Sequence, residues 1–151
     1  MRHIESVVMF LVVILASAGF VAAQGTELEV VDSPYAEEFD YKVGQTLDLN
    51  LRLGGLRWSV LTVGAGDEAD WREGKKVKTY FTNELENLTN TPLTFSIIIL
   101  LEDDRGRQLE RIKLKNIKVG AGRYFEDIQK VKVDGGILAG TGKVYLFAEV
   151  K

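Results

Sequence analysis

Residues 45–53 read QTLDLNLRL and carry the clearest structural signal in the sequence. Leucine occupies every second position from Leu47 to Leu53, and polar residues fill the positions between. Successive side chains of a β-strand point to opposite faces, so this alternation predicts a strand with one buried face. Gly54-Gly55 predicts a turn, and residues 57–63 (RWSVLTV) predict the returning strand of a β-hairpin, with Trp58 in the core.

Working outward toward the C-terminus, residues 75–83 predict a third strand with Phe81 on its buried face and Tyr80 on the other face. Residues 93–102 (LTFSIIILLE) are apolar on both faces, which predicts a strand central to its sheet. Asp103-Asp104-Arg105-Gly106 predicts a tight turn with Gly106 in a left-handed conformation. The stretch therefore continues as strand, turn and strand.

The remaining segments extend the same pattern. Residues 109–114 alternate, but Ile117 and Val119 continue out of phase, which predicts a bulge or a crossover between sheets. Residues 128–133 and 143–150 predict the closing strands, separated by a glycine-rich loop, whereas residues 24–41 look acidic and irregular apart from a short edge strand near Val30. We therefore expect one all-β domain over residues 24–151, an antiparallel β-sandwich of about seven or eight strands without a helix.

The N-terminus has the features of a signal peptide over residues 1–23. Arg2 is followed by an uncharged apolar run over residues 7–18, and Val21 and Ala23 fit cleavage after Ala23. An uncleaved membrane anchor is the alternative interpretation. Cleavage would leave no stable membrane span and a periplasmic or extracellular protein, and the lack of cysteine favours a bacterial exported protein.

A family resemblance covers residues 77–150. It lies in YFTN (80–83), PLTFSIIILLEDDRGRQL (92–109), IKVGAGRYF (117–125) and GKVYLFAEV (142–150). In this order the stretch resembles a bacterial exported immunoglobulin-like or fibronectin-type-III-like sandwich domain. The Cys-Trp-Cys arrangement of antibody domains is missing. The resemblance implies an adhesive, spacer or scaffold module.

The residue inventory excludes several chemistries. The only histidine is His3, and the chain contains no cysteine. This excludes Ser-His-Asp and Cys-His catalysis, thiol redox chemistry and the usual zinc and haem sites from residues 24–151, and we expect no cofactor. Carboxylates remain available, in two acidic loops at residues 67–70 and 102–104. These loops could hydrolyse glycans through paired acids or bind calcium weakly, or they could be ordinary solvated turns. The calcium candidates are Asp67, Asp70, Asp103 and Asp104.

Charge is distributed unevenly along the chain. The net charge of −3 does not favour nucleic-acid binding, but residues 24–104 contain 16 acids and seven bases, whereas residues 105–151 contain 11 bases and five acids. Arg111, Lys113 and Lys115 alternate and should project from one face, and neighbouring strands could extend this patch with Lys118, Lys130 and Lys132. The patch predicts an acidic protein or anionic glycan partner, or head-to-tail self-association; the alternative is the ordinary wet face of a sheet.

Two aromatic residues complete the binding candidates. Trp71 lies in an acidic loop. It either binds a sugar or a protein, or it folds back to close the end of the sandwich. Tyr80 could be exposed nearby. Asn87-Leu88-Thr89 forms a glycosylation sequon, and the sequence leaves open whether Asn87 is modified. We expect an exported, non-catalytic module for protein binding, adhesion or envelope assembly. A carbohydrate-binding module, or a carboxylate-based glycan-active enzyme, is the alternative.

Overall fold

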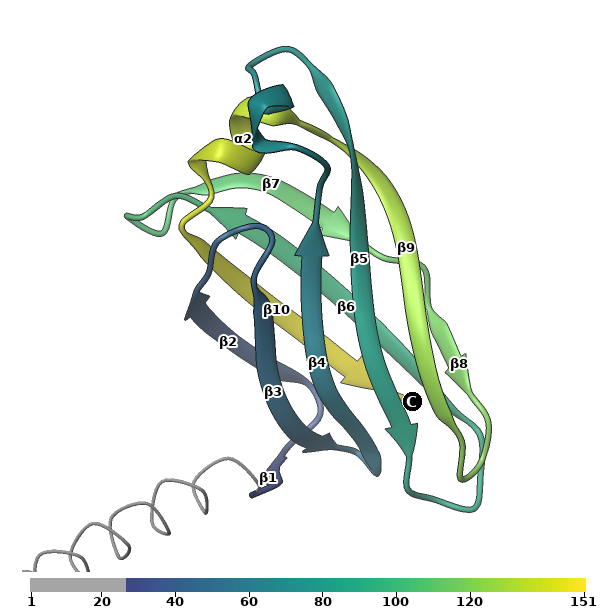
Figure 1. Ribbon diagram of the computed structural model, residues 1–151. Helices are drawn as coiled ribbons and strands as arrows, with labels where there is room; N and C mark the ends of the chain where they lie inside the picture. Colours follow the sequence, from purple (N-terminus) through teal and green to yellow (C-terminus); the bar gives the residue numbers. More distant parts are fainter. Residues whose placement is uncertain (1–26) are drawn as a thin grey trace, which may run out of the picture.

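The computed structural model describes residues 27–151, which form two β-sheets packed face to face (Figure 1). Sheet A contains, in spatial order, β1 (Glu29–Val31), β3 (Thr46–Leu53), β4 (Leu56–Gly64), β5 (Lys76–Asn87) and β9 (Tyr124–Asp134). Sheet B contains, in spatial order, β2 (Tyr35–Asp40), β10 (Lys143–Val150), β6 (Leu93–Glu102) and β7 (Gln108–Lys113), while β8 (Ile117–Val119) pairs with another part of β6. The signal peptide predicted over residues 1–23 lies outside the described residues.

The predicted hairpin is confirmed. Strands β3 and β4 pair in antiparallel fashion, and the turn residues Gly54 and Gly55 both have positive φ, at 53° and 84°. A Cβ atom on Gly55 would lie only 2.5 Å from the side chain of Thr89, so the turn needs glycine for space as well as for its backbone conformation.

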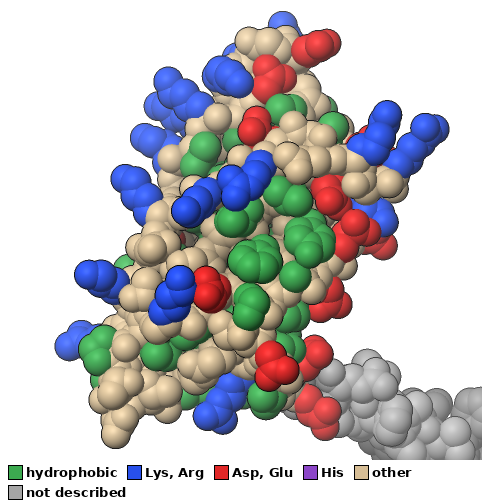
Figure 2. Space-filling view, turned by 180° about the vertical axis from the view of Figure 1, so that it is seen from behind, with side chains coloured by type: hydrophobic (Ala, Val, Ile, Leu, Met, Phe, Trp, Pro, Cys, Tyr) green, Lys and Arg blue, Asp and Glu red, His purple; other side chains and the backbone are tan. Residues whose placement is uncertain are grey.

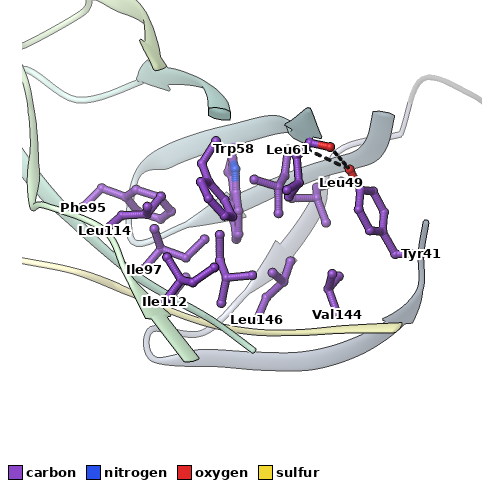
Figure 3. Packing of buried hydrophobic residues seen from close by; sticks show 14 of the residues in the cluster. Tyr41, Leu49, Trp58, Leu61, Phe95, Ile97, Ile112, Leu114, Val144 and Leu146 are labelled. Atoms are coloured by element: carbon purple, nitrogen blue, oxygen red, sulfur yellow. Dashed lines mark hydrogen bonds between the residues drawn. The ribbon is translucent and has the colours of Figure 1, made fainter. Parts of the chain in front are cut away.

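The core lies between the sheets and is filled by the inward-facing residues of both (Figure 3). Trp58 on β4 is fully buried, as predicted, and its ring meets Phe95 on β6 edge-on with centroids 5.1 Å apart. Strand β6 lies between β10 and β7, so the prediction of a central strand is also confirmed. The apolar side chains that alternate along the strands therefore hold the two sheets together without disulfides.

The N-terminal part of the fold differs from the expectation. Residues 35–40 form β2, which pairs with β10, and Tyr35 and Tyr41 are buried in the core. The interpretation of this segment as irregular was wrong because an edge strand needs few apolar residues, and here Tyr35 and Phe39 are the apolar residues on the inward face, with Glu37 between them. Strand β1 pairs with β3 in parallel, so the sandwich is not purely antiparallel.

Two features of the C-terminal half were also not predicted. Residues 135–140 form a short helix, α2 (Gly135–Gly140), where a loop was expected. Glycine is a poor helix former, but Asp134 caps the helix by accepting a bond from the Gly136 N–H at 2.9 Å, and Leu138 is buried. The Gly135 N–H donates to the Lys75 carbonyl at 2.8 Å, which joins α2 to the loop before β5.

The change of phase after residue 114 is an interruption, not a crossover. Strands β7 and β8 both pair with β6, and the chain reaches sheet A only after the turn at residues 120–123. Leu114 still donates its backbone N–H to the Ile97 carbonyl of β6, but Lys115 and Asn116 leave the ladder, so Ile117 re-enters with the opposite parity and is buried again.

The architecture is a two-sheet sandwich. Here β3, β4 and β5 form a continuous meander within sheet A. Within residues 27–151 no helix is long and apolar enough to cross a membrane.

Candidate functional site

The outward face of sheet B carries an apolar cluster that no described residue covers. We call Ile98, Leu100, Tyr145 and Phe147 the outer patch. Phe147 is 37% exposed, and the other three side chains are partly buried against one another. Figure 2 shows hydrophobic side chains gathered in the middle of one face, with Lys and Arg along its left side and most Asp and Glu on the right.

The pairing register explains this arrangement. Phe147 lies directly across from Ile98, and Tyr145 lies across from Leu100, so the four side chains form a compact square on the two central strands. Side chains on opposite positions of antiparallel strands lie about 5 Å apart. The square is continued toward β2 by Ala36 and Glu38, and toward β7 by Lys113 and Arg111.

The outer patch was missed at the sequence level, although its signal was present. The run over residues 97–101 is apolar at every position, and a strand of that kind is expected to be buried on both faces. In this fold its inner face forms the core, while the outer face is left to solvent. An apolar surface of this kind is characteristic of an interaction site.

The basic residues predicted as a patch lie along two open strand edges. Arg111 and Lys113 belong to β7, at one edge of sheet B, and Lys130 and Lys132 belong to β9, at one edge of sheet A. Lys113, Lys115 and Lys130 line a groove of about 500 Å³ between these edges, and Arg111 and Lys132 line its continuation. We call these five residues the basic seam.

The structure therefore brings the predicted basic residues together, but across the gap between the two sheets. Lys118 is exposed on β8, beyond the grooves. The lining of the grooves also includes Ile112, Ile128 and Val131, together with the acids Glu110 and Asp127. Basic side chains outnumber acids along the grooves, which suits an extended acidic segment.

A pocket of about 390 Å³ lies at the end of the sandwich next to α2. Trp71, Glu68 and Asp104 line it together with Lys42 and residues 138–141. The two acidic loops, far apart in the sequence, thus contribute one carboxylate each to the same hollow. We call it the end pocket.

The two aromatic candidates have different positions. Trp71 is half-buried, packs against the core and donates its indole N–H to the Ala65 carbonyl at 3.1 Å, which agrees with the interpretation that it closes the end of the sandwich. Tyr80 is 44% exposed on the outer face of sheet A, while its neighbour Phe81 is buried. Tyr80 does not line the end pocket.

Three of the four calcium candidates serve local structure, and the fourth, Asp104, lines the end pocket. Asp67 caps the 3-10 helix η1 (Glu68–Asp70) by accepting the Ala69 N–H, and Asp70 forms an ion pair with Lys75 at 2.6 Å. Asp103 accepts the backbone N–H groups of Arg105 and Arg107 within its turn. Across residues 27–151 no three candidate ligands converge on a metal position.

The pKa values of two of these carboxyls argue against roles as proton donors. The hydrogen bond from Lys75 lowers the pKa of Asp70, and the backbone hydrogen bond from Arg107 lowers the pKa of Asp103. Both groups therefore stay ionised well below neutral pH. A general acid needs the opposite shift.

One carboxyl is shifted upward. Glu102 is buried, and burial followed by the neighbouring Glu38 raises its pKa. Glu38 itself accepts a hydrogen bond from Lys143 at 2.8 Å, which lowers the pKa of Glu38 and raises that of Lys143. Because one Glu102 oxygen has no hydrogen-bond partner, this carboxyl destabilises the fold when it ionises.

The sequon residue Asn87 is buried. Its side-chain amide donates to the Thr91 and Val119 carbonyls, and its oxygen accepts from the backbone and hydroxyl of Thr89. Asn87 is 1% exposed and its amide is fully bonded, so the folded chain leaves no room for a glycan on this side chain.

No protein-family model matches the sequence, and no curated protein is significantly similar to it.

Proposed function

We propose that this chain is an exported, non-catalytic module that binds a protein partner through the outer patch. The observation that carries the proposal is the square of Ile98, Leu100, Tyr145 and Phe147, left uncovered on the central strands of sheet B. Aromatic and aliphatic side chains held rigidly on a sheet lose little conformational entropy when a partner covers them.

The charged surroundings of the outer patch support the same proposal. Arg111 and Lys113 border the patch on the β7 side, and Glu38 borders it on the β2 side. Protein interfaces combine an apolar centre with a polar rim, and the rim charges favour one orientation of the partner. The lack of histidine and cysteine beyond His3 favours binding over catalysis.

A photo-crosslinking experiment tests this proposal in producing cells. A photoreactive phenylalanine analogue is placed at Phe147 or, as the matched control, at Tyr80, which is similarly exposed but lies on sheet A. We expect a discrete adduct with one other protein from position 147 and none from position 80. A second substitution, Leu100→Lys, should abolish the adduct while the purified variant keeps its β-sheet circular dichroism spectrum.

Three results would overturn the proposal. These are the absence of any adduct at position 147, the same adducts from both positions, and adducts that persist in the Leu100→Lys variant. Fractionation of the same cells tests export, because an exported protein should be recovered outside the cytoplasm and shortened at its N-terminus. A full-length protein confined to the cytoplasm would contradict that part of the proposal.

The end pocket supports carbohydrate binding as a second candidate function. It combines an indole with two carboxylates and Lys42, and sugars are bound by stacking on aromatic rings and by hydrogen bonds to charged side chains. The half-buried position of Trp71 leaves only part of its ring for such stacking.

A glycan array distinguishes the two candidates. If the end pocket binds a glycan, the protein should give a signal that Glu68→Gln or Asp104→Asn removes. Asp70→Asn is the matched control, because Asp70 lies in the same loop but does not line the pocket. No signal from the unmodified protein would eliminate this candidate, and so would a signal that survives both pocket substitutions.

A further inference from the structure

Sheet B has one acidic and one basic edge strand. The acidic edge, β2, carries Glu37, Glu38 and Asp40 and no base, whereas the basic edge, β7, carries Arg111 and Lys113 and one acid, Glu110. Within residues 27–151, neither strand has a partner on its outer side. An edge strand presents unpaired N–H and C=O groups, so each edge can pair with a further strand.

We propose that copies of this chain associate head to tail, with β2 of one copy pairing along β7 of the next and continuing sheet B. This inference does not depend on the function proposed for the outer patch. The occupant of the β7 edge is therefore a second copy of the chain, and the contact is made between strand edges instead of faces.

Strand direction permits this contact. Successive strands in the order β2, β10, β6 and β7 are all antiparallel, so β2 and β7 run in opposite directions. A second copy placed beside the first in the same orientation presents its β2 antiparallel to β7. Sheet A has the same property, because β1 and β9 also run in opposite directions.

The side chains also match in one register. With Arg111 opposite Asp40 of the next copy, Lys113 lies opposite Glu38, and all four side chains are on the outward face. The same register places the inward-facing Ile112 opposite Phe39, whose side chain is only partly buried at its edge. Opposite charges and apolar pairs in cross-strand positions are both stabilising.

The charges also select against symmetric pairing. Two antiparallel β2 strands would bring Glu38 of each copy against Asp40 of the other, and two β7 strands would do the same with Arg111 and Lys113. Like charges in opposite positions destabilise a strand pair. A contact between two different surfaces does not close into a dimer, so it should build open chains.

Analytical ultracentrifugation of the purified protein tests this proposal at low ionic strength, at concentrations up to about 1 mM. We expect species larger than a dimer to accumulate with concentration and to dissociate in salt, which screens charges at the surface. Asp40→Arg or Arg111→Asp alone should weaken association by at least about fivefold, since each turns an attractive cross-strand pair into a repulsive one. The double variant Asp40→Arg and Arg111→Asp, in which the charges of the pair are reversed, should regain the association.

Matched controls distinguish this contact from a general charge effect. Asp48→Arg and Arg72→Asp make the same charge changes at exposed positions off the two edges and should leave association unchanged, as should Phe147→Ser in the outer patch. Four results would overturn the proposal. The protein could stay monomeric, association could stop at the dimer, the double variant could associate as weakly as the single variants, or association could be lost only with Phe147→Ser. Thermal unfolding of every variant verifies that the fold is retained.

Discussion

Gln129 on β9 binds the backbone of Lys115 twice. The Lys115 N–H donates to the Gln129 side-chain oxygen at 2.7 Å, and the Gln129 amide donates to the Lys115 carbonyl at 2.9 Å. Lys115 lies in the interruption between β7 and β8, so one side chain of sheet A supplies the bonds that the ladder of sheet B lacks there. The pair joins the two sheets where the sandwich is open.

Gln129→Ala should lower the free energy of unfolding by about 1–3 kcal/mol, because it removes the two hydrogen bonds to the Lys115 backbone, each of which contributes about 0.5–1.5 kcal/mol. Urea titration measures the loss. Gln129→Glu keeps only the acceptor and should give an intermediate value. Equal stability of the alanine variant and the unmodified protein would show that water replaces the amide without cost.

Asn83→Ala should be more damaging. Asn83 is fully buried on β5 and accepts the indole N–H of Trp58 at 3.0 Å. Truncation leaves that N–H unsatisfied and opens a cavity beside the ring, so we expect a loss of about 2–4 kcal/mol. The neighbouring Thr82→Ala, on the outward face, should change the unfolding free energy by less than about 0.5 kcal/mol.

Glu102→Gln should stabilise the protein at neutral pH. The pKa of Glu102 is raised in the folded state, so the carboxyl favours folding below its usual value of 4.5 and opposes folding once the pH rises through the folded pKa. The variant lacks this penalty. Thermal unfolding should show a higher midpoint for the variant at pH 7 and no difference near pH 4, and a lower midpoint at pH 7 would contradict the prediction.

Tyr41→Phe tests a second buried polar group. The Tyr41 hydroxyl accepts the Val63 N–H at 2.8 Å and donates to the Gln45 carbonyl at 2.6 Å, so its loss should cost about 1–3 kcal/mol. Burial raises the pKa of Tyr41 to about 12. The folded state therefore favours the protonated phenol, and stability should fall as the pH rises from 10 toward 12. The phenylalanine variant should lack this fall in stability when its unfolding is measured across the same pH range.

The sequence predicted the centre of the sandwich better than its edges. Strands with a strict alternation, such as residues 47–53, announce their buried face because every second position must be apolar. Edge strand β2 was missed because its outward positions are free to be acidic. Helix α2 was missed because its glycines do not favour a helix, which is stabilised here by the Asp134 cap and the buried Leu138.

The candidate surfaces were only partly predictable for a similar reason. The alternation of Arg111 and Lys113 indicated one exposed face, and the structure has them exposed on one strand. Their position beside β9 depends on how the two sheets close, which no local pattern specifies. Predicting the outer patch requires knowing which face of β6 is covered, and this is defined only when the two sheets have assembled.

Gly135 lets the start of α2 pack closely against the loop that carries Trp71. A Cβ atom there would lie 2.4 Å from the Arg72 nitrogen and 2.7 Å from the Arg72 carbonyl oxygen, which are backbone atoms that cannot rotate away. Anyone who randomises the pocket wall to alter its specificity should therefore keep this position constant. Even the addition of one methyl group would separate the loop that carries Trp71 from the helix beside it.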